Sequence, residues 1–186
     1  SYAKGRTCAE TDYRVLKGGY LNEVTSSSPC EQMDGWPAAQ ECVGGLGMVS
    51  PEYKAMTLER FGSLDPLDPL SYNKARSVVF SQDFVMVMDS LELCLFTSEW
   101  ALGACTLKDA AELFQAVTGI DTGEEDLIRA AVRIRDLERA FWVREGFTRK
   151  DDHLEGKIKN EAVPDGPYKG EKMDKAKFEK MLDEYY

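Results

Sequence analysis

The chain has 186 residues, enough for one domain with a sizeable hydrophobic core. Its 33 acidic and 23 basic residues give a net charge of −10, which argues against binding to nucleic acid or to an anionic membrane. The sequence contains no apolar stretch of the roughly 18 residues that a membrane span needs, and no signal-peptide pattern. We therefore expect a cytoplasmic protein that binds neither nucleic acid nor membranes.

The cysteines are odd in number and irregularly spaced: Cys8, Cys30, Cys42, Cys94 and Cys105. Such a set does not suit the disulfide framework of a secreted protein and favours a reducing compartment. No C-x-x-C pair or His-Cys set provides a self-contained metal site, so we expect no zinc site. We interpret Cys8, Cys30 and Cys42 as structural residues.

The first 50 residues are predicted to form loops and short helices, because turn-forming segments interrupt them: Gly18-Gly19, residues 26–29 and Gly44-Gly45. Ser50 is a typical N-cap before a proline, and Gly62 is a typical helix end, so we expect a helix over residues 51–61. Two Asp-Pro turns follow in residues 64–70, which we interpret as a rigid connector.

Residues 84–96 form a nearly unbroken apolar run that continues the helical pattern of residues 75–83. We expect one mostly buried helix that carries Cys94 at its end. On such a helix, Asp89 and Leu93 share a face because they are four residues apart.

Two interpretations of this run remain open. Gln82, Asp89 and Glu92 can form a thin solvated stripe, with Cys94 as a small buried side chain. Alternatively, Asp89 is present to accept hydrogen bonds from a polar ligand, and Cys94 is a thiolate ligand beside it.

A loop over residues 97–105 is expected next, with Trp100 and Cys105 filling the core. Thr106 and Asp109 then predict a capped helix that ends at Gly119. Its expected apolar face consists of Ala110, Ala111, Leu113, Phe114 and Val117.

Thr122 and Glu125 predict a capping box for a long helix that ends at Gly146. The apolar side chains of this helix recur at helical spacing and are expected to be buried: Leu127, Ala131, Ile134, Leu137 and Phe141. Its arginines are expected to form surface ion pairs with neighbouring acidic residues: Arg129, Arg133, Arg135 and Arg139.

Residues 150–172 are charged and rich in glycine and proline, so we expect an extended loop. Asp174 is a typical N-cap for the last helix, and Met173 is placed to pack on Phe178. No segment shows convincing strand alternation. The predicted fold is all-α, an irregular multi-helical bundle.

Two segments carry a family resemblance. Residues 89–94 read D-S-L-E-L-C, and residues 137–152 read L-E-R-A-F-W-V-R-E-G-F-T-R-K-D-D. They are similar to the D-x-x-G-L-C and L-E-R-x-F-N-x-R-E-G-x-T-R-x-D-D segments of the tungsten-containing aldehyde ferredoxin oxidoreductase family. The V-T-G at residues 117–119 and the M-L-D-E-Y-Y at residues 181–186 also match.

The resemblance implies that residues 1–186 are the C-terminal helical domain of a larger oxidoreductase, with N-terminal domains outside this chain. In that family, two pterin dithiolenes hold tungsten, or sometimes molybdenum, beside a 4Fe-4S cluster. Cys94 is thereby implied as the fourth cluster ligand, and Asp89 and the Leu93 backbone region as pterin contacts. The other three cluster cysteines come from a C-x-x-C-x-x-x-C motif that this chain lacks. An aldehyde substrate and a ferredoxin partner are also implied, and a homo-oligomer is left open.

The sequence departs from the family at several positions. Glu92 replaces a glycine, Trp142 replaces an asparagine, and the one histidine, His153, lies downstream of the cysteine segment rather than upstream. No catalytic residue is therefore assigned. Two alternatives remain: a same-scaffold enzyme for aromatic thioester reduction or hydroxy-acid oxidation, and a non-enzymatic helical interaction domain.

The Arg144 to Asp152 block borders the cofactor region in the family, and simple inter-domain salt bridging is the other interpretation of its charges. We also expect the chain alone to be colourless and inactive, since one cysteine cannot hold a four-cysteine cluster.

Overall fold

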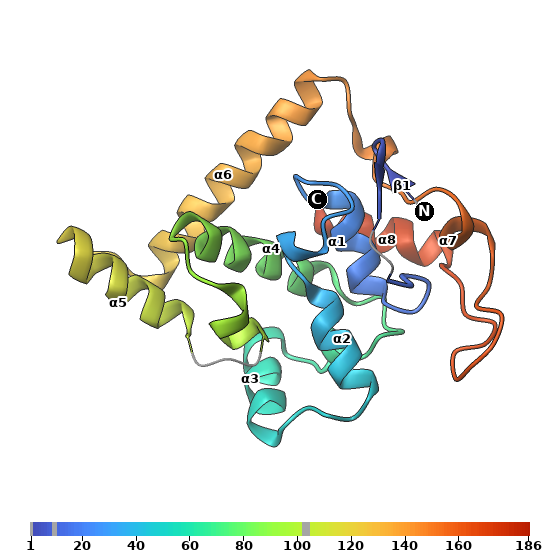
Figure 1. Cartoon of the computed structure of the whole chain (residues 1–186), viewed down its shortest axis with the longest axis horizontal. Coiled ribbons are helices and arrows are strands. Elements are labelled where there is room, and N and C mark those ends of the chain that lie inside the picture. Colours follow the sequence, from blue (N-terminus) through green and yellow to red (C-terminus); the bar gives the residue numbers. More distant parts are fainter. Residues whose placement is uncertain (1, 9–10, 102–104) are drawn as a thin grey trace.

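The structure is a computed structural model that describes residues 2–8, 11–101 and 105–186 (Figure 1). Its helices are α1 (Lys17–Thr25), α2 (Pro37–Gly45), α3 (Pro51–Phe61), α4 (Ala75–Ser90), α5 (Leu107–Thr118), α6 (Glu124–Arg144), α7 (Lys157–Asn160) and α8 (Lys175–Tyr185). A short antiparallel pair, β1 (Tyr2–Ala3) with β2 (Arg6–Thr7), is the only sheet in the described part of the chain. The prediction of an irregular all-α fold is confirmed. Among the described residues, no helix has the length and apolar character of a membrane span.

Helix α4 lies between two apolar cores and contacts α1, α2, α6 and α8 (Figure 1). Ala75 and Val78, in its first half, belong to a core shared with α1 and α8. Phe84 and Met88, in its second half, belong to a core shared with α5 and α6. Trp100 is 2% exposed in this second core, as the sequence predicted. Residues 102–104 of the predicted loop lie outside the described residues.

The glycine pair at 18–19 lies inside α1, so its prediction as a turn was wrong. The Gly18 and Gly19 N–H groups donate to the buried Glu41 carboxylate at 2.7 and 2.9 Å. A Cβ on Gly18 would lie 3.0 Å from the same carboxylate, so glycine permits this close approach. Lys74 completes the cluster with an ion pair to Glu41 at 3.2 Å. The free-energy cost of burying the Glu41 and Lys74 charges is offset by the ion pair between them.

Most predicted helix ends are confirmed. Ser50 caps α3 by accepting from the Tyr53 N–H, and Gly62 ends that helix in the left-handed conformation. Thr106 forms a capping box with Asp109 at the start of α5. The N-cap of α6 was predicted one residue too early: Gly123 holds that position, and its N–H donates to Asp126 at 2.9 Å.

Asp174 caps α8 by accepting from the Lys177 N–H, as predicted. Met173 and Phe178, expected to pack together, are both buried in the first core. Residues 150–172 are largely irregular, with two short exceptions. These are a 3₁₀ turn at Arg149–Asp151 and the four-residue helix α7.

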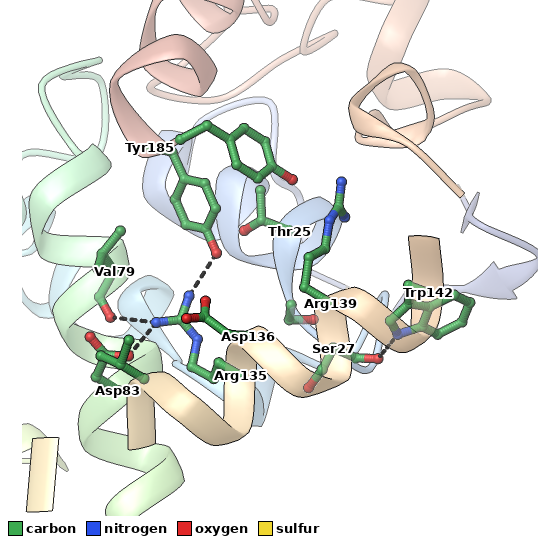
Figure 2. A pocket seen from close by; sticks show the side chains of 12 residues that line it. Thr25, Ser27, Val79, Asp83, Arg135, Asp136, Arg139, Trp142 and Tyr185 are labelled. Carbon is green, nitrogen blue, oxygen red and sulfur yellow. Dashed lines mark hydrogen bonds and ion pairs between the residues drawn. The ribbon is translucent and has the colours of Figure 1, made fainter. Parts of the chain in front are cut away.

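Arg135 does not form the predicted surface ion pair with its helix neighbours. Its guanidinium reaches Asp83 on α4 and donates to the Tyr185 hydroxyl at 2.8 Å (Figure 2). It also donates to Gln82 at 2.7 Å. Gln82, expected on a solvated stripe, is accordingly 2% exposed. Arg135, Asp83 and Tyr185 border a cavity of about 250 Å³. Trp142 borders it too, and its ring N–H donates to the Ser27 carbonyl at 2.7 Å.

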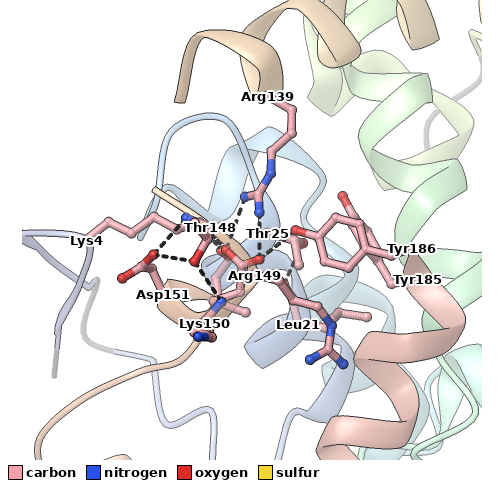
Figure 3. Close-up of polar contacts among 12 residues, drawn as sticks. Lys4, Leu21, Thr25, Arg139, Thr148, Arg149, Lys150, Asp151, Tyr185 and Tyr186 are labelled. Atoms are coloured by element: carbon pink, nitrogen blue, oxygen red, sulfur yellow. Dashed lines mark hydrogen bonds and ion pairs between the residues drawn. The ribbon is translucent and has the colours of Figure 1, made fainter. Parts of the chain in front are cut away.

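Arg139 likewise points away from its helix neighbours, toward the buried carboxylate of Asp152 (Figure 3). Asp152 is 1% exposed and also binds Lys4 Nζ at 2.5 Å and the Tyr186 hydroxyl at 2.5 Å. Burial lowers the pKa of Lys4, while Asp152 opposes that shift. Arg149 pairs with Glu179 of α8 at 3.2 Å. These contacts tie the residues after α6 to both ends of the chain, which supports a structural role for this block.

The outer face of α6 also differs from its prediction. Leu127 and Ala131 are buried, whereas Ile134, Leu137 and Phe141 are 37%, 72% and 52% exposed. On α5, Ala110 and Ala111 are buried, but Leu113 and Val117 are 51% and 85% exposed. In Figure 1, α5 extends to the left of the other helices, and α6 runs diagonally past α4. The helical periodicity identified these faces correctly but not their burial.

Candidate functional site: the turn after α4

Helix α4 ends at Ser90, four residues before Cys94, so the predicted helix was too long. Glu92 has φ of +57°, the left-handed conformation that ends many helices. The Glu92 N–H donates to the Asp89 carbonyl at 3.1 Å, and the Leu93 N–H donates to the Met88 carbonyl at 2.8 Å. This pair of hydrogen bonds is the Schellman motif. Asp89 is on the helix and Leu93 is beyond it, so the two do not share a helix face.

Cys94 is exposed, which contradicts the interpretation of a small buried side chain. Its backbone is extended, with φ of −68° and ψ of 122°, at the start of the 3₁₀ turn Leu95–Thr97. The Cys94 carbonyl accepts from the Thr97 N–H at 3.0 Å and the Thr97 hydroxyl at 2.7 Å. The Leu93 side chain is half-buried against the second core. Cys94 therefore lies between two hydrogen-bonded turns, the one that ends α4 and the 3₁₀ turn that follows, and its thiol is accessible.

Asp89 is largely exposed in the last turn of α4. The surrounding protein raises the pKa of Asp89 by desolvating its carboxylate. Asp89 shares a small cavity with Asp34, and burial raises the pKa of Asp34 to about 6. Asp34 accepts a hydrogen bond from the Ser28 N–H at 2.9 Å. Arg135 also lines this cavity, so its polar groups include both carboxyls and a guanidinium.

The sequence analysis missed an aromatic neighbour of this turn. Phe96 is 61% exposed and packs edge-to-face on Trp36, with ring centroids 5.1 Å apart. Trp36 precedes α2 and holds a left-handed backbone with φ of +49°. The proline after Trp36 is a helix-start signal that could have placed it at the N-cap. No local signal pairs Trp36 with Phe96, since 60 positions separate them.

Cys94 and Asp89 do not form a complete metal site. Within the described ranges, the single group of three potential metal ligands that lie close together is elsewhere, around Glu23. Cys42 is also exposed, and Cys105 is half-buried. Burial raises the pKa of the Cys105 thiol, with Asp109 and Glu99 adding to the shift. Any metal centre at Cys94 therefore needs further ligands from outside this chain.

The described residues thus combine a helical fold with an exposed thiol at Cys94 and exposed apolar side chains on α5 and α6. The family model described as "Aldehyde ferredoxin oxidoreductase, domains 2 & 3" matches residues 2–186. The chain belongs to the aldehyde ferredoxin oxidoreductase family.

Curated relatives agree with this assignment. The chain is 34% identical over 140 residues to the tungsten-containing aldehyde ferredoxin oxidoreductase of Pyrococcus furiosus, covering 75% of this chain and 21% of that protein. The enzymes with the same name from Pyrococcus abyssi and Thermococcus kodakarensis are 33% and 32% identical with the same coverage. The chain thus spans about a fifth of the length of these relatives.

Proposed function

We propose that this chain is the C-terminal part of a tungsten or molybdenum pterin enzyme that oxidises an aldehyde to a carboxylic acid. In this reaction one aldehyde and one water give the acid, two protons that go to solvent and two electrons; a 4Fe-4S cluster would carry the electrons to ferredoxin. The observation that carries the proposal is the exposed Cys94 at the position of the family's cluster cysteine, presented by a hydrogen-bonded turn.

The donor set fits this role. Cys94 would supply one of four thiolates, and the remaining three would come from the part of the protein outside this chain. When bound, the cluster carries single electrons and the metal-pterin group performs the oxidation. The Asp89 carboxylate can accept hydrogen bonds from pterin N–H groups. The Leu93 N–H already donates to Met88, so Leu93 would contact a pterin through its carbonyl or side chain.

The Schellman turn has a specific task in this proposal. It fixes the separation between Asp89, on the helix, and Cys94, after it, through the hydrogen bonds that the Glu92 and Leu93 N–H groups donate. A rigid turn keeps the thiolate in position while the cluster changes charge, because no backbone group must rearrange. The exposed Glu92 adds a negative charge to this turn. That charge favours a substrate or cofactor environment different from that of relatives with glycine, so a same-scaffold activity on a thioester or hydroxy acid is the second candidate.

The test uses the full-length protein purified without oxygen. Tungsten, molybdenum and iron are measured in the wild type, in Cys94→Ser and in the matched control Cys42→Ser, which alters the other exposed thiol. The expected result is tungsten or molybdenum with about four irons per chain in wild type and control, and loss of cluster absorbance in Cys94→Ser. Turnover with aldehydes, aromatic thioesters and hydroxy acids then separates the two candidate activities.

Two results would contradict the proposal. A full-length protein without tungsten, molybdenum or iron would favour a helical interaction domain. A Cys94→Ser variant that retains its cluster would remove Cys94 from the ligand set.

A further inference from the structure

Cys8 and Cys30 meet beside the last turn of α1, and the structure joins their sulfurs in a disulfide. The spacing of the cysteines did not predict this pairing. One Glu23 carboxylate oxygen lies with the two sulfurs, all three atoms being within 4.8 Å of one another. The site belongs to a different end of α1 from the Glu41 cluster and is separate from the turn that carries Cys94.

Glu23 is fully buried, and among the described residues neither of its carboxylate oxygens has a hydrogen-bond partner. Burial raises the pKa of Glu23 to about 7. The buried Tyr13 hydroxyl faces Glu23 and partly counteracts this rise in pKa, although the two groups do not form a well-aligned hydrogen bond. A buried carboxylate is strongly unfavourable unless a donor or a cation satisfies it. A disulfide is neutral and donates no hydrogen, so beside it Glu23 is accommodated by taking up a proton. A cation bound by the reduced thiols would instead satisfy the ionised carboxylate.

Backbone contacts fix the three ligands from three segments of the chain. Glu23 lies in α1, and its own carbonyl accepts from the Cys30 N–H at 3.0 Å, which folds the following loop back onto the helix. Cys8 follows β2, and Lys4 of the same hairpin donates to the Val24 carbonyl at 2.5 Å. The ligands are therefore brought together by the fold and not by neighbouring positions in the sequence.

We propose that the reduced thiols of Cys8 and Cys30, together with the Glu23 carboxylate, bind one Zn²⁺ ion. Two thiolates and one carboxylate, with a water molecule in the fourth position, suit the tetrahedral preference of zinc. Magnesium and calcium prefer all-oxygen sites. Zinc–sulfur bonds of about 2.3 Å at a tetrahedral angle separate the sulfurs by about 3.8 Å, so the disulfide must be reduced before the ion can bind.

Charge also favours a cation at this position. Glu31 and Asp34 add negative potential at Glu23, and Arg6 opposes them only weakly. On binding, each thiol releases its proton to solvent and the ion neutralises the buried carboxylate. The Tyr13 hydroxyl can then donate to the carboxylate oxygen that the metal leaves free.

The test uses the full-length protein, purified without oxygen in a non-thiol reductant and incubated with Zn²⁺ before excess metal is removed. Zinc content is measured in the wild type, in Cys30→Ser, in Glu23→Gln and in the control Cys42→Ser. We expect one zinc per chain in wild type and control, loss in Cys30→Ser, and at least about tenfold weaker binding in Glu23→Gln. Zinc-edge X-ray absorption should show two sulfur neighbours at about 2.3 Å.

Equal zinc contents in wild type and Cys30→Ser would overturn the proposal, as would a zinc environment without sulfur. A Cys8–Cys30 disulfide recovered by peptide mapping from the reductant-treated protein would also overturn it. Glu23→Gln preserves the side-chain shape, so it separates loss of a ligand from loss of folding. Tungsten and iron contents are measured in the same samples, so this site and the Cys94 site can fail independently.

Discussion

Replacing Glu92 with glycine should stabilise the turn that presents Cys94. The left-handed conformation at Glu92, with φ of +57°, costs a residue with a Cβ about 1–2 kcal/mol. Glycine does not have this cost. However, glycine increases the conformational entropy of the unfolded chain, which lowers the stability of the folded state by roughly 0.4–1 kcal/mol. The net stabilisation is about 0.8 kcal/mol, which is roughly a fourfold change in an opening equilibrium.

Hydrogen exchange in the full-length protein measures this effect where it occurs. The Leu93 amide, bonded to the Met88 carbonyl at 2.8 Å, reports opening of the turn. After correction for intrinsic rates, its exchange in Glu92→Gly should be about fourfold slower than in wild type. Glu92→Ala is the control, since it removes the carboxylate but keeps the Cβ. Equal slowing in both variants would show that charge repulsion, not backbone strain, destabilises the turn, and would refute the reasoning.

Three further predictions concern the body of the chain. In Gly44→Ala, the new Cβ would lie 1.9 Å from the Leu67 carbonyl oxygen. The free energy of unfolding measured in urea should therefore fall by about 3 kcal/mol. An unchanged urea midpoint would contradict this prediction. In Asp152→Asn, the buried Lys4 ammonium loses its carboxylate partner, which should lower the free energy of unfolding by about 3–5 kcal/mol. Adding Lys4→Met to this variant should recover part of the loss. If the losses of the two single variants simply add in the double variant, the pairing of Lys4 with Asp152 would be contradicted. Burial raises the pKa of Asp34 from 3.8 to about 6. The folded protein therefore holds the Asp34 proton more tightly than the unfolded chain does. The stability that this proton provides is lost as the pH rises through about 6. Thermal melting should therefore favour Asp34→Asn over wild type by about 3 kcal/mol at pH 8, with the difference vanishing near pH 3.5. A constant difference would exclude this titration.

The sequence predicted structure well where the cause is local. The caps at Ser50, Thr106 and Asp174 are confirmed because each side chain acts on an amide three residues away. The end of α4 was missed because Glu92 occupies a position where glycine usually marks a left-handed residue. Gly18 was misread as a turn because the carboxylate that requires it, on Glu41, is distant in the sequence.

The candidate site also has features that the sequence predicted and features that it did not. The family resemblance selected Asp89, Leu93 and Cys94, but helical periodicity placed them on one continuous helix. The structure instead separates Asp89 from the other two by a turn. Trp36, which packs beside Phe96 near this turn, came from a segment whose spacing carries no signal for the contact.

Burial of α6 could not be predicted from periodicity for a further reason. A helical repeat identifies side chains that share a face, but it does not specify what covers that face. Arg135 and Arg139 fix one side of α6 to α4, α8 and the residues after α6, which leaves Leu137 at 72% and Phe141 at 52% exposure. These exposures are those of a chain that matches about a fifth of its relatives' length. We therefore expect the exposed apolar stripe of α6 to contact a part of the protein outside this chain, because large exposed apolar surfaces usually mark an interaction site.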